Sequence, residues 1–133
     1  MNGKGRIDVF LKRKEKRARH WRYGNTGGME TNRLEILLGL VTQNPADSFA
    51  RYGLAMEYAK AGHLEEAVTQ FRGVIANNAE YTYAYFHGGQ NLEKLGSLED
   101  AKDLYEQGIA VARRIGDGKA LTELQAALDL LPL

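Results

Sequence analysis

The sequence has no cysteine, only two prolines and no long apolar run. The absence of cysteine excludes disulfides, thiolate metal sites and cysteine nucleophiles, and it suits a reducing compartment. The longest apolar stretch, residues 36–41, is far shorter than the roughly 18 residues that a membrane-spanning helix needs. The first residues are basic but lack the continuous apolar segment of a secretory signal. We therefore expect a soluble, cytoplasmic protein without a membrane span.

Catalytic patterns are missing as well. The three histidines are scattered, and no pair of them has the spacing of metal ligands on a helix. A phosphate-binding glycine loop follows a strand, and no segment from Asn32 onward alternates with the period of a strand. Paired acids at 65–66 and 99–100 fall at expected helix starts, where the helix dipole explains them. The sequence predicts no catalytic residue, no metal site and no cofactor, and therefore no enzyme.

Positive charge is concentrated at one end of the chain. Residues 1–28 hold nine of the 18 Lys and Arg but two of the 17 acids, a net charge of +7, which leaves −6 for residues 29–133. This asymmetry predicts a basic, flexible N-terminal arm over 1–28 and a folded domain over 29–133, joined at the linker-like 25–28. The arm's candidate contacts to an anionic partner are Lys12, Arg13, Lys14, Lys16, Arg17, Arg19 and Arg22.

The arm admits several interpretations. If residues 7–22 were helical, Ile7, Phe10, Leu11, Ala18 and Trp21 would share one side, and the helix could lie on an anionic membrane or contact nucleic-acid phosphates. Dense like charges also suit a solvated tail. A third interpretation places a native start at residue 29, just before the first capped helix. The sequence leaves these alternatives open.

About six helices are expected from residue 32 onward, because apolar residues recur at helical spacing between regular breaks. The first helix should begin at a capping box over residues 32–35 and end at Asn44-Pro45. Later helices should begin after Asp47, Ser97 and Asp117, while glycines close three of them in the left-handed conformation. The breaks are Asn77-Asn78 and the glycines at 62, 96 and 116.

An internal repeat is the strongest feature of the chain. A shift of 34 residues places 48–79 on 82–113, and small residues fall where two helices must approach closely while large residues fill the space beside them. The small positions are Ala55, Ala67, Gly89 and Ala101, the large ones Tyr58, Phe71, Leu92 and Tyr105, and identities include Ala50/Ala84, Lys60/Lys94, Gly62/Gly96, Leu64/Leu98, Glu65/Glu99 and Ile75/Ile109.

These residues resemble the tetratricopeptide repeat (TPR) family over 32–131, as two full repeats between two half-repeats. The chain departs from the family pattern at Arg51 and Tyr85, where tryptophan is common, and at Ala79 and Arg113, where proline closes the repeat. The resemblance implies an all-α fold in which antiparallel helix-turn-helix repeats form a short right-handed superhelical solenoid.

In this family the first helix of each pair lines a concave groove that binds another protein. The matching positions are Phe49, Tyr52, Met56, Ala59 and Lys60, then Tyr83, Phe86, Gln90, Glu93 and Lys94, followed by Asp117, Ala120, Leu124, Ala127 and Leu128. Phe49, Tyr52 and Met56 share a face that Leu54 and Tyr58 cannot occupy, so something else must cover them.

The leading hypothesis is a scaffold or adaptor whose aromatic groove binds a peptide or helix of a partner protein. Two alternatives are that the last helix fills the groove and that two copies bury it in a homodimer. A further alternative is a protein that binds nucleic acid or an anionic surface through its arm and uses the repeats to dimerise or dock.

Two adjacent glycines, Gly88 and Gly89, interrupt an expected helix at a cost of about 1 kcal/mol each relative to alanine. Close packing of the helix pair explains Gly89. For Gly88 we expect either a gap for a bulky neighbour such as Tyr58 or room for a ligand backbone, and a Gly88→Ala variant that melts at a higher temperature.

Overall fold

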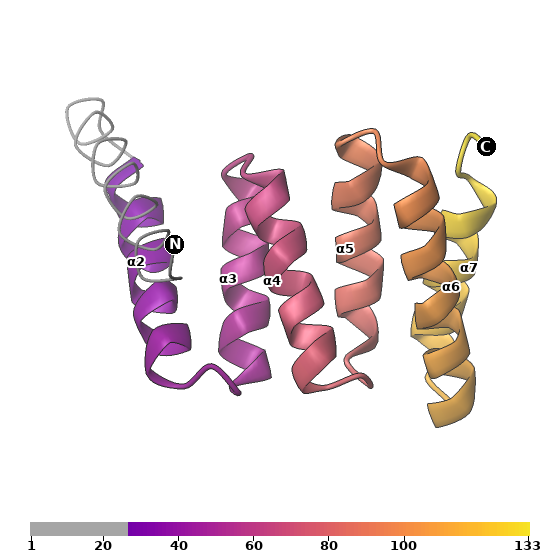
Figure 1. Ribbon diagram of the computed structural model, residues 1–133, viewed down its shortest axis with the longest axis horizontal. Coiled ribbons are helices and arrows are strands. Elements are labelled where there is room, and N and C mark those ends of the chain that lie inside the picture. The colour runs from indigo at the N-terminus through magenta and orange to yellow at the C-terminus, as the bar shows by residue number, and fades with distance from the viewer. Residues whose placement is uncertain (1–26) are drawn as a thin grey trace, which may run out of the picture. The chain divides into compact units, whose positions relative to one another are not determined.

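The computed structural model describes residues 27–133, and it divides the chain into two compact units, Met1–Ile36 and Leu37–Leu133. The described residues form helices and no strand: α2 (Gly27–Gln43), α3 (Ser48–Lys60), α4 (Leu64–Asn77), α5 (Thr82–Lys94), α6 (Leu98–Ile115) and α7 (Gly118–Asp129). Figure 1 shows α3 and α4, and then α5 and α6, as antiparallel neighbours. The prediction of an all-α fold of about six helices is confirmed, while residues 1–26 of the basic arm lie outside the described residues.

Most of the predicted helix ends are confirmed. The carboxylates of Asp47 and Asp117 accept the backbone N–H groups of Ala50 and Ala120, each at 3.1 Å, and so cap α3 and α7. The glycines at 62, 96 and 116 have φ values of 84°, 82° and 76°, the left-handed conformation that allows a helix to end in a tight turn.

One predicted capping bond and one predicted helix start are wrong. The helix α6 begins directly after Ser97 as expected, but the Ser97 hydroxyl makes no capping hydrogen bond. The helix α2 begins at Gly27, five residues before the capping box that we expected at Asn32. Because residues 29–31 can also adopt the helical conformation, Asn32 lies inside α2 instead of capping it.

Small residues bring the helices of each pair close together. Ala55, Ala67 and Ala101 are fully buried, as are the rings of Phe71 and Tyr105. A methyl group built on Gly89 would lie 2.2 Å from the nearest atom of the Tyr105 ring. The close approach that we inferred for Gly89 is therefore confirmed.

The neighbours of Gly88 differ from our expectation. A methyl group built on it would meet the Leu104 Cδ2 at 2.8 Å and the Phe71 Cβ at 3.3 Å, so the bulky neighbours are these two residues and not Tyr58. Leu104 belongs to the partner helix α6 and Phe71 to the preceding pair, and both reach the same face of α5. Because the site is already filled, the expected rise in melting temperature for Gly88→Ala is withdrawn.

Polar side chains replace the usual tryptophan at equivalent places in the two repeats. The Arg51 Nη2 donates to the Pro45 carbonyl at 3.0 Å, and the Tyr85 hydroxyl donates to the Ala79 carbonyl at 2.7 Å. Pro45 and Ala79 are themselves 34 residues apart. Both side chains therefore tie the start of a first helix back to the turn that precedes it.

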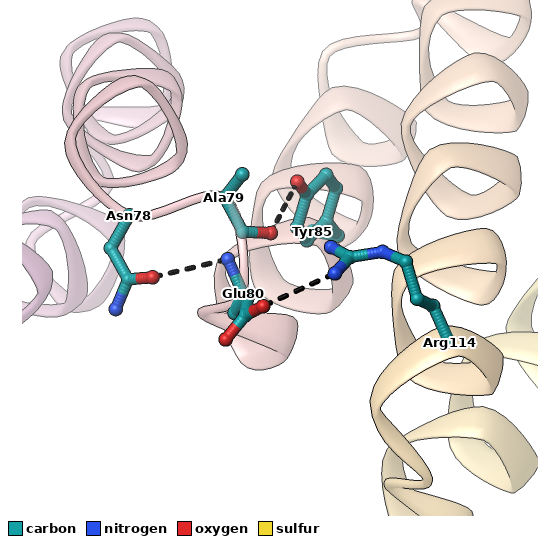
Figure 2. Close-up of polar contacts among 5 residues, drawn as sticks. All are labelled: Asn78, Ala79, Glu80, Tyr85 and Arg114. Carbon is teal, nitrogen blue, oxygen red and sulfur yellow. Dashed lines mark hydrogen bonds and ion pairs between the residues drawn. The ribbon is translucent and has the colours of Figure 1, made fainter.

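Figure 2 shows this turn in the second repeat. The Glu80 backbone N–H donates to the Asn78 Oδ1 at 3.1 Å, and the Glu80 carboxylate pairs with Arg114 of α6 at 3.2 Å. The ion pair is exposed and contributes little stability, about 0–1 kcal/mol. Its geometric effect is to join the turn before α5 to the last turn of α6.

Candidate functional site

A cluster of aromatic rings connects the first helices of the two repeats. It consists of Tyr52 from α3, Phe71 from α4, Tyr81 from the turn before α5, and Tyr83, Phe86 and His87 from α5. The Tyr52 ring lies 4.8 Å from the Tyr81 ring and 5.8 Å from that of Phe71, measured between centroids. Such separations are typical of favourable ring pairs. The cluster therefore holds α3 against the pair that follows it.

His87 lies at the centre of this ring cluster. Its centroid is 5.2 Å from Phe86, 6.0 Å from Tyr52, 6.1 Å from Phe71 and 6.3 Å from Tyr83. Burial among these rings lowers the pKa of His87, although the Gln90 side chain, 3.3 Å from Nδ1, and the Glu123 carboxylate act in the opposite direction. The imidazole is therefore neutral at pH 7.

Sequence reasoning missed both His87 and Tyr81. The position equivalent to His87 in the first repeat holds Gly53, so no recurring residue type marked it. Tyr81 lies in the turn, where a repeat pattern carries no packing signal. Because the aromatic residues of α5 are at helical spacing, the sequence could have indicated a cluster, but its bridge to the turn depends on tertiary packing.

Tyr52 is only partly accessible. Burial raises its pKa to about 12, with Tyr81 and Tyr83 adding smaller contributions. Tyr83 and Phe86 are also half-buried, with ring centroids 6.3 Å apart in an edge-to-face arrangement. Burial raises the pKa of Tyr83, and the nearby Glu123 carboxylate of α7 raises it further. These three predicted groove residues are therefore partly covered by the contacts of the ring cluster that joins α3 to α5.

The other predicted groove residues are more open. The Phe49 side chain is 80% exposed and that of Met56 37%, while Lys60 and Lys94 are exposed and Gln90 is half-buried. Phe49 and Met56 lie on α3 at the spacing that shares a face with Tyr52. Of the eight predicted groove residues, four are thus half-buried and four are exposed. The half-buried ones are Tyr52, Tyr83, Phe86 and Gln90, and the exposed ones are Phe49, Met56, Lys60 and Lys94.

The groove residues that we predicted on α7 are partly wrong. Ala120 and Leu124 are 1% and 0% exposed, and Leu124 packs against Gly108 of α6. The helix α6 has 18 residues where α4 has 14, and the turn after it is shorter, so α7 is displaced by two positions from the 34-residue register. In the displaced register, the positions equivalent to Tyr83, Phe86 and Gln90 hold Lys119, Thr122 and Ala126, all of which are exposed.

The packing of α7 also bears on the alternative that the last helix fills the groove. It contacts both α5 and α6, and its buried residues enter the core beside Tyr85 and Tyr105. This is the place of a third first helix in the repeat order. The helix continues the stack and leaves Phe49 and Met56 exposed.

Residues 27–133 contain no helix with the length and hydrophobicity that crossing a membrane requires. Within the described part of the chain, no three His, Asp or Glu side chains gather in a way that could hold a metal ion.

Known proteins resemble the chain at several levels. No model of a known protein family matches it. A TPR repeat-containing protein from Pseudomonas aeruginosa is 26% identical over 98 residues, which cover 74% of this chain and 93% of that protein. The complex of PcrH with the chaperone binding region of PopD has a TM-score of 0.73 over 93% of this chain and 92% of PcrH, but at 16% identity it shows the fold alone.

A solved structure provides the decisive likeness. A tetratricopeptide repeat domain protein from Salinibacter ruber is 38% identical, with a TM-score of 0.62, over 67% of this chain and 90% of that protein. Together with the 34-residue period and the paired helices, this likeness identifies the chain as a member of the tetratricopeptide repeat family.

Proposed function

We propose that the chain is a non-enzymatic interaction module that binds an apolar peptide or helix of another protein. The site is the face of α3 and α5 formed by Phe49, Tyr52, Met56, Tyr83 and Phe86, which we call the ring-lined wall. The single observation that supports it most is the 80% exposure of Phe49, one helical turn before the half-buried Tyr52 on α3. Met56, on the same face of α3, is 37% exposed, and exposed apolar side chains grouped on one face are typical of a surface that a partner covers.

The energies are consistent with moderate affinity. Burying one aromatic or methionine side chain contributes roughly 1.5–3 kcal/mol. Phe49 and Met56 have most to gain, because Tyr52 and Phe86 already lose water contact within the chain. With partial contributions from the half-buried rings, the sum supports a complex of about micromolar dissociation constant after the cost of association.

The structurally related PcrH binds the chaperone binding region of PopD on the same fold. This complex supports the class of function proposed here, binding of a partner segment, without indicating which protein this chain binds.

The test uses peptides selected by display on the full chain, whose affinities are then measured by calorimetry. Phe49→Ala and Met56→Ala should each weaken the selected peptide about five- to tenfold, while Arg72→Ala on the exposed side of α4 should leave it unchanged. Because Phe49 and Met56 are exposed, their replacement should not disturb folding, unlike that of Tyr52. If Phe49→Ala, Met56→Ala and Arg72→Ala all weakened binding equally, or if none of them did, the ring-lined wall would be excluded as the site.

The alternative function, binding of nucleic acid or an anionic surface through the arm, falls on residues outside the described part of the chain. It stays a prediction, and a salt titration separates it from the first proposal. About seven phosphate contacts would give a slope of log K against log salt near −6. Binding at the ring-lined wall should respond little to salt, since its contacts are mainly apolar.

A further inference from the structure

A group of polar side chains from α5 and α7 lies beside the ring-lined wall, and we call it the polar cluster. It consists of the Tyr83 hydroxyl, His87, Gln90 and Glu123. Burial raises the pKa of Tyr83 and lowers that of His87, and the nearby Glu123 carboxylate acts to raise both. Tyr83 also belongs to the ring-lined wall, and the His87 ring lies 5.2 Å from that of Phe86 between centroids. The two surfaces are therefore continuous.

Glu123 is the member of the polar cluster that carries a formal charge. The His87 imidazole is neutral at pH 7, and the Gln90 amide and the Tyr83 hydroxyl are uncharged. Among residues 27–133 Glu123 forms no ion pair, and Lys119, one turn earlier on α7, is exposed and forms none either. A half-buried carboxylate in this position has lost part of its hydration, and no cation of the described chain replaces it.

The Glu123 carboxylate also has unused acceptor positions. A carboxylate offers about four such positions on its two oxygens. The Tyr83 hydroxyl is buried beside Glu123 but makes no hydrogen bond of good geometry to any residue that the structure describes. The His87 Nδ1 contacts the Gln90 Oε1, at 3.3 Å, and not the carboxylate. An ammonium or guanidinium group can therefore bind Glu123 without displacing an established hydrogen bond.

The lysines of the first helices do not reverse this charge preference. Lys60 and Lys94 stand in the last turns of α3 and α5, and both are exposed. Glu123 lies in the middle of α7 and is half-buried. Charges on exposed, long side chains are screened by water and salt, whereas a half-buried carboxylate is screened less. The charge that a bound segment meets beside Tyr83 is thus negative.

We propose that the partner segment carries a lysine or arginine beside its apolar anchors, and that Glu123 accepts this basic side chain. This contact rests on the proposed function, since the ring-lined wall holds the apolar part of the segment. The wall spans α3 and α5 while Glu123 lies on α7, so the basic residue stands at one end of the segment, beyond the residue that packs on Tyr83. A wholly apolar segment binds less well, because it covers the carboxylate without supplying a cation.

The first test is the sequence that the chain selects. Display on the full chain, from a library that contains all residue types, should return peptides with Lys or Arg on one side of the apolar anchors. A synthetic analogue of each peptide has methionine in place of the basic residue, which keeps the apolar stem and removes the charge. Calorimetry at low ionic strength should show that the analogue binds about fivefold more weakly. The difference should shrink as salt is added.

A Glu123→Gln variant identifies the residue that accepts the charge. It should weaken the basic peptide about fivefold, because the amide keeps the size of the side chain but not its charge. It should bind the methionine analogue at least as tightly as the wild-type chain does. Glu106→Gln, on the exposed side of α6, is the matched control and should alter neither affinity.

The His87 ring provides a readout that a merely structural role of Glu123 would not change. A cation bound at Glu123 offsets the negative charge that acts to raise the pKa of His87. In an NMR titration, the pKa of His87 should therefore be lower with the basic peptide bound than with its methionine analogue. In Glu123→Gln the two peptides should give nearly the same pKa.

The results separate this inference from the proposed function. If the selected peptides depend on Phe49 and Met56 but carry no basic residue, the inference is wrong and the proposed function stands. The same holds if Glu123→Gln weakens the basic peptide and its analogue equally. If peptide binding does not depend on Phe49 and Met56, the proposed function fails, and the contact at Glu123 fails with it.

Discussion

The two repeats of this chain, 48–79 and 82–113, share one backbone plan and differ in how each helix pair is closed. In the first repeat the buried ring is Phe71, and the facing position on the first helix is Ala59. In the second repeat the buried ring is Tyr105, whose hydroxyl donates to the Glu93 carboxylate, and Glu93 is the residue equivalent to Ala59. An added hydroxyl is thus matched by an added acceptor, as a buried polar group requires.

A second set of linked residues lies at the start of each first helix. Arg51 donates both to the Pro45 carbonyl and to the Gln70 Oε1, the latter at 2.8 Å, whereas Tyr85 has one hydroxyl and donates to the Ala79 carbonyl. In the second repeat the position of Gln70 holds Leu104, which is apolar and packs against Gly88. Residues therefore change in sets within a repeat, so a single exchange between repeats should be costly.

The largest effect is expected from Gly89→Ala, which gives the second repeat the small residue of the first, Ala55. The new methyl group would overlap the Tyr105 ring at 2.2 Å, and that ring is fully buried and hydrogen-bonded to Glu93. We expect the free energy of unfolding in urea to fall by about 2 kcal/mol, because overpacking exceeds the gain in helix propensity.

Gly88→Ala is the matched control for that variant. Here the overlap is with the end of the Leu104 side chain, which can move more easily than a ring. The stability should fall by less than about 1 kcal/mol, as the helix-propensity gain offsets most of the strain. Equal losses from the two variants would show that the ring of Tyr105 does not set the distance between the helices.

An intermediate effect is expected from the pair Tyr105 and Glu93. Tyr105→Phe alone should lower the free energy of unfolding by about 1 kcal/mol, because a hydrogen bond to a charged but partly solvated carboxylate is lost. The double variant with Glu93→Ala reproduces the first repeat's Phe71 and Ala59. A double-mutant cycle should therefore give a coupling of about 1 kcal/mol. Additive losses would mean that the hydroxyl and the carboxylate contribute independently.

Local features of the fold could be predicted from the sequence, whereas features that depend on element length could not. The glycines at 62 and 96 and the cap at Asp47 were predictable because each acts within a few residues. The position of α7 was not, because it depends on the extra turn of α6, which no local signal marks. Because the predicted register of α7 was wrong by two residues, Leu124 was assigned to the groove although it lies in the core.

The candidate site shows the same limit. Helical spacing correctly placed Phe49, Tyr52 and Met56 on one face of α3. It could not predict that Tyr81 and His87 would pack against the Tyr52 ring. Tyr81 lies in a turn 29 positions further along the chain and His87 lies on the helix after that turn, so both contacts depend on tertiary packing. Periodicity identifies which residues share a face, but tertiary packing decides which of them remain accessible.

The smallest effect expected concerns His87, the ring that distinguishes the second repeat from the first, where Gly53 stands. Burial lowers the pKa of His87 below its ordinary value of about 6.5. The groups facing it are Tyr52 from α3, Phe71 from α4, Tyr83, Phe86 and Gln90 from its own helix, and Glu123 from α7. Between the folded and unfolded pKa values the unfolded chain binds more protons, so the contribution of His87 to stability is complete above pH 6.5 and is lost as the pH falls through the folded pKa.

An NMR titration of the His87 ring should consequently give a pKa below 6.5. The difference in urea midpoint between pH 7.0 and pH 5.0 should be smaller in His87→Gln than in the wild-type chain, and comparison with this variant isolates the contribution of His87. If the wild-type ring titrated at or above 6.5, the imidazole would not be desolvated by the ring cluster.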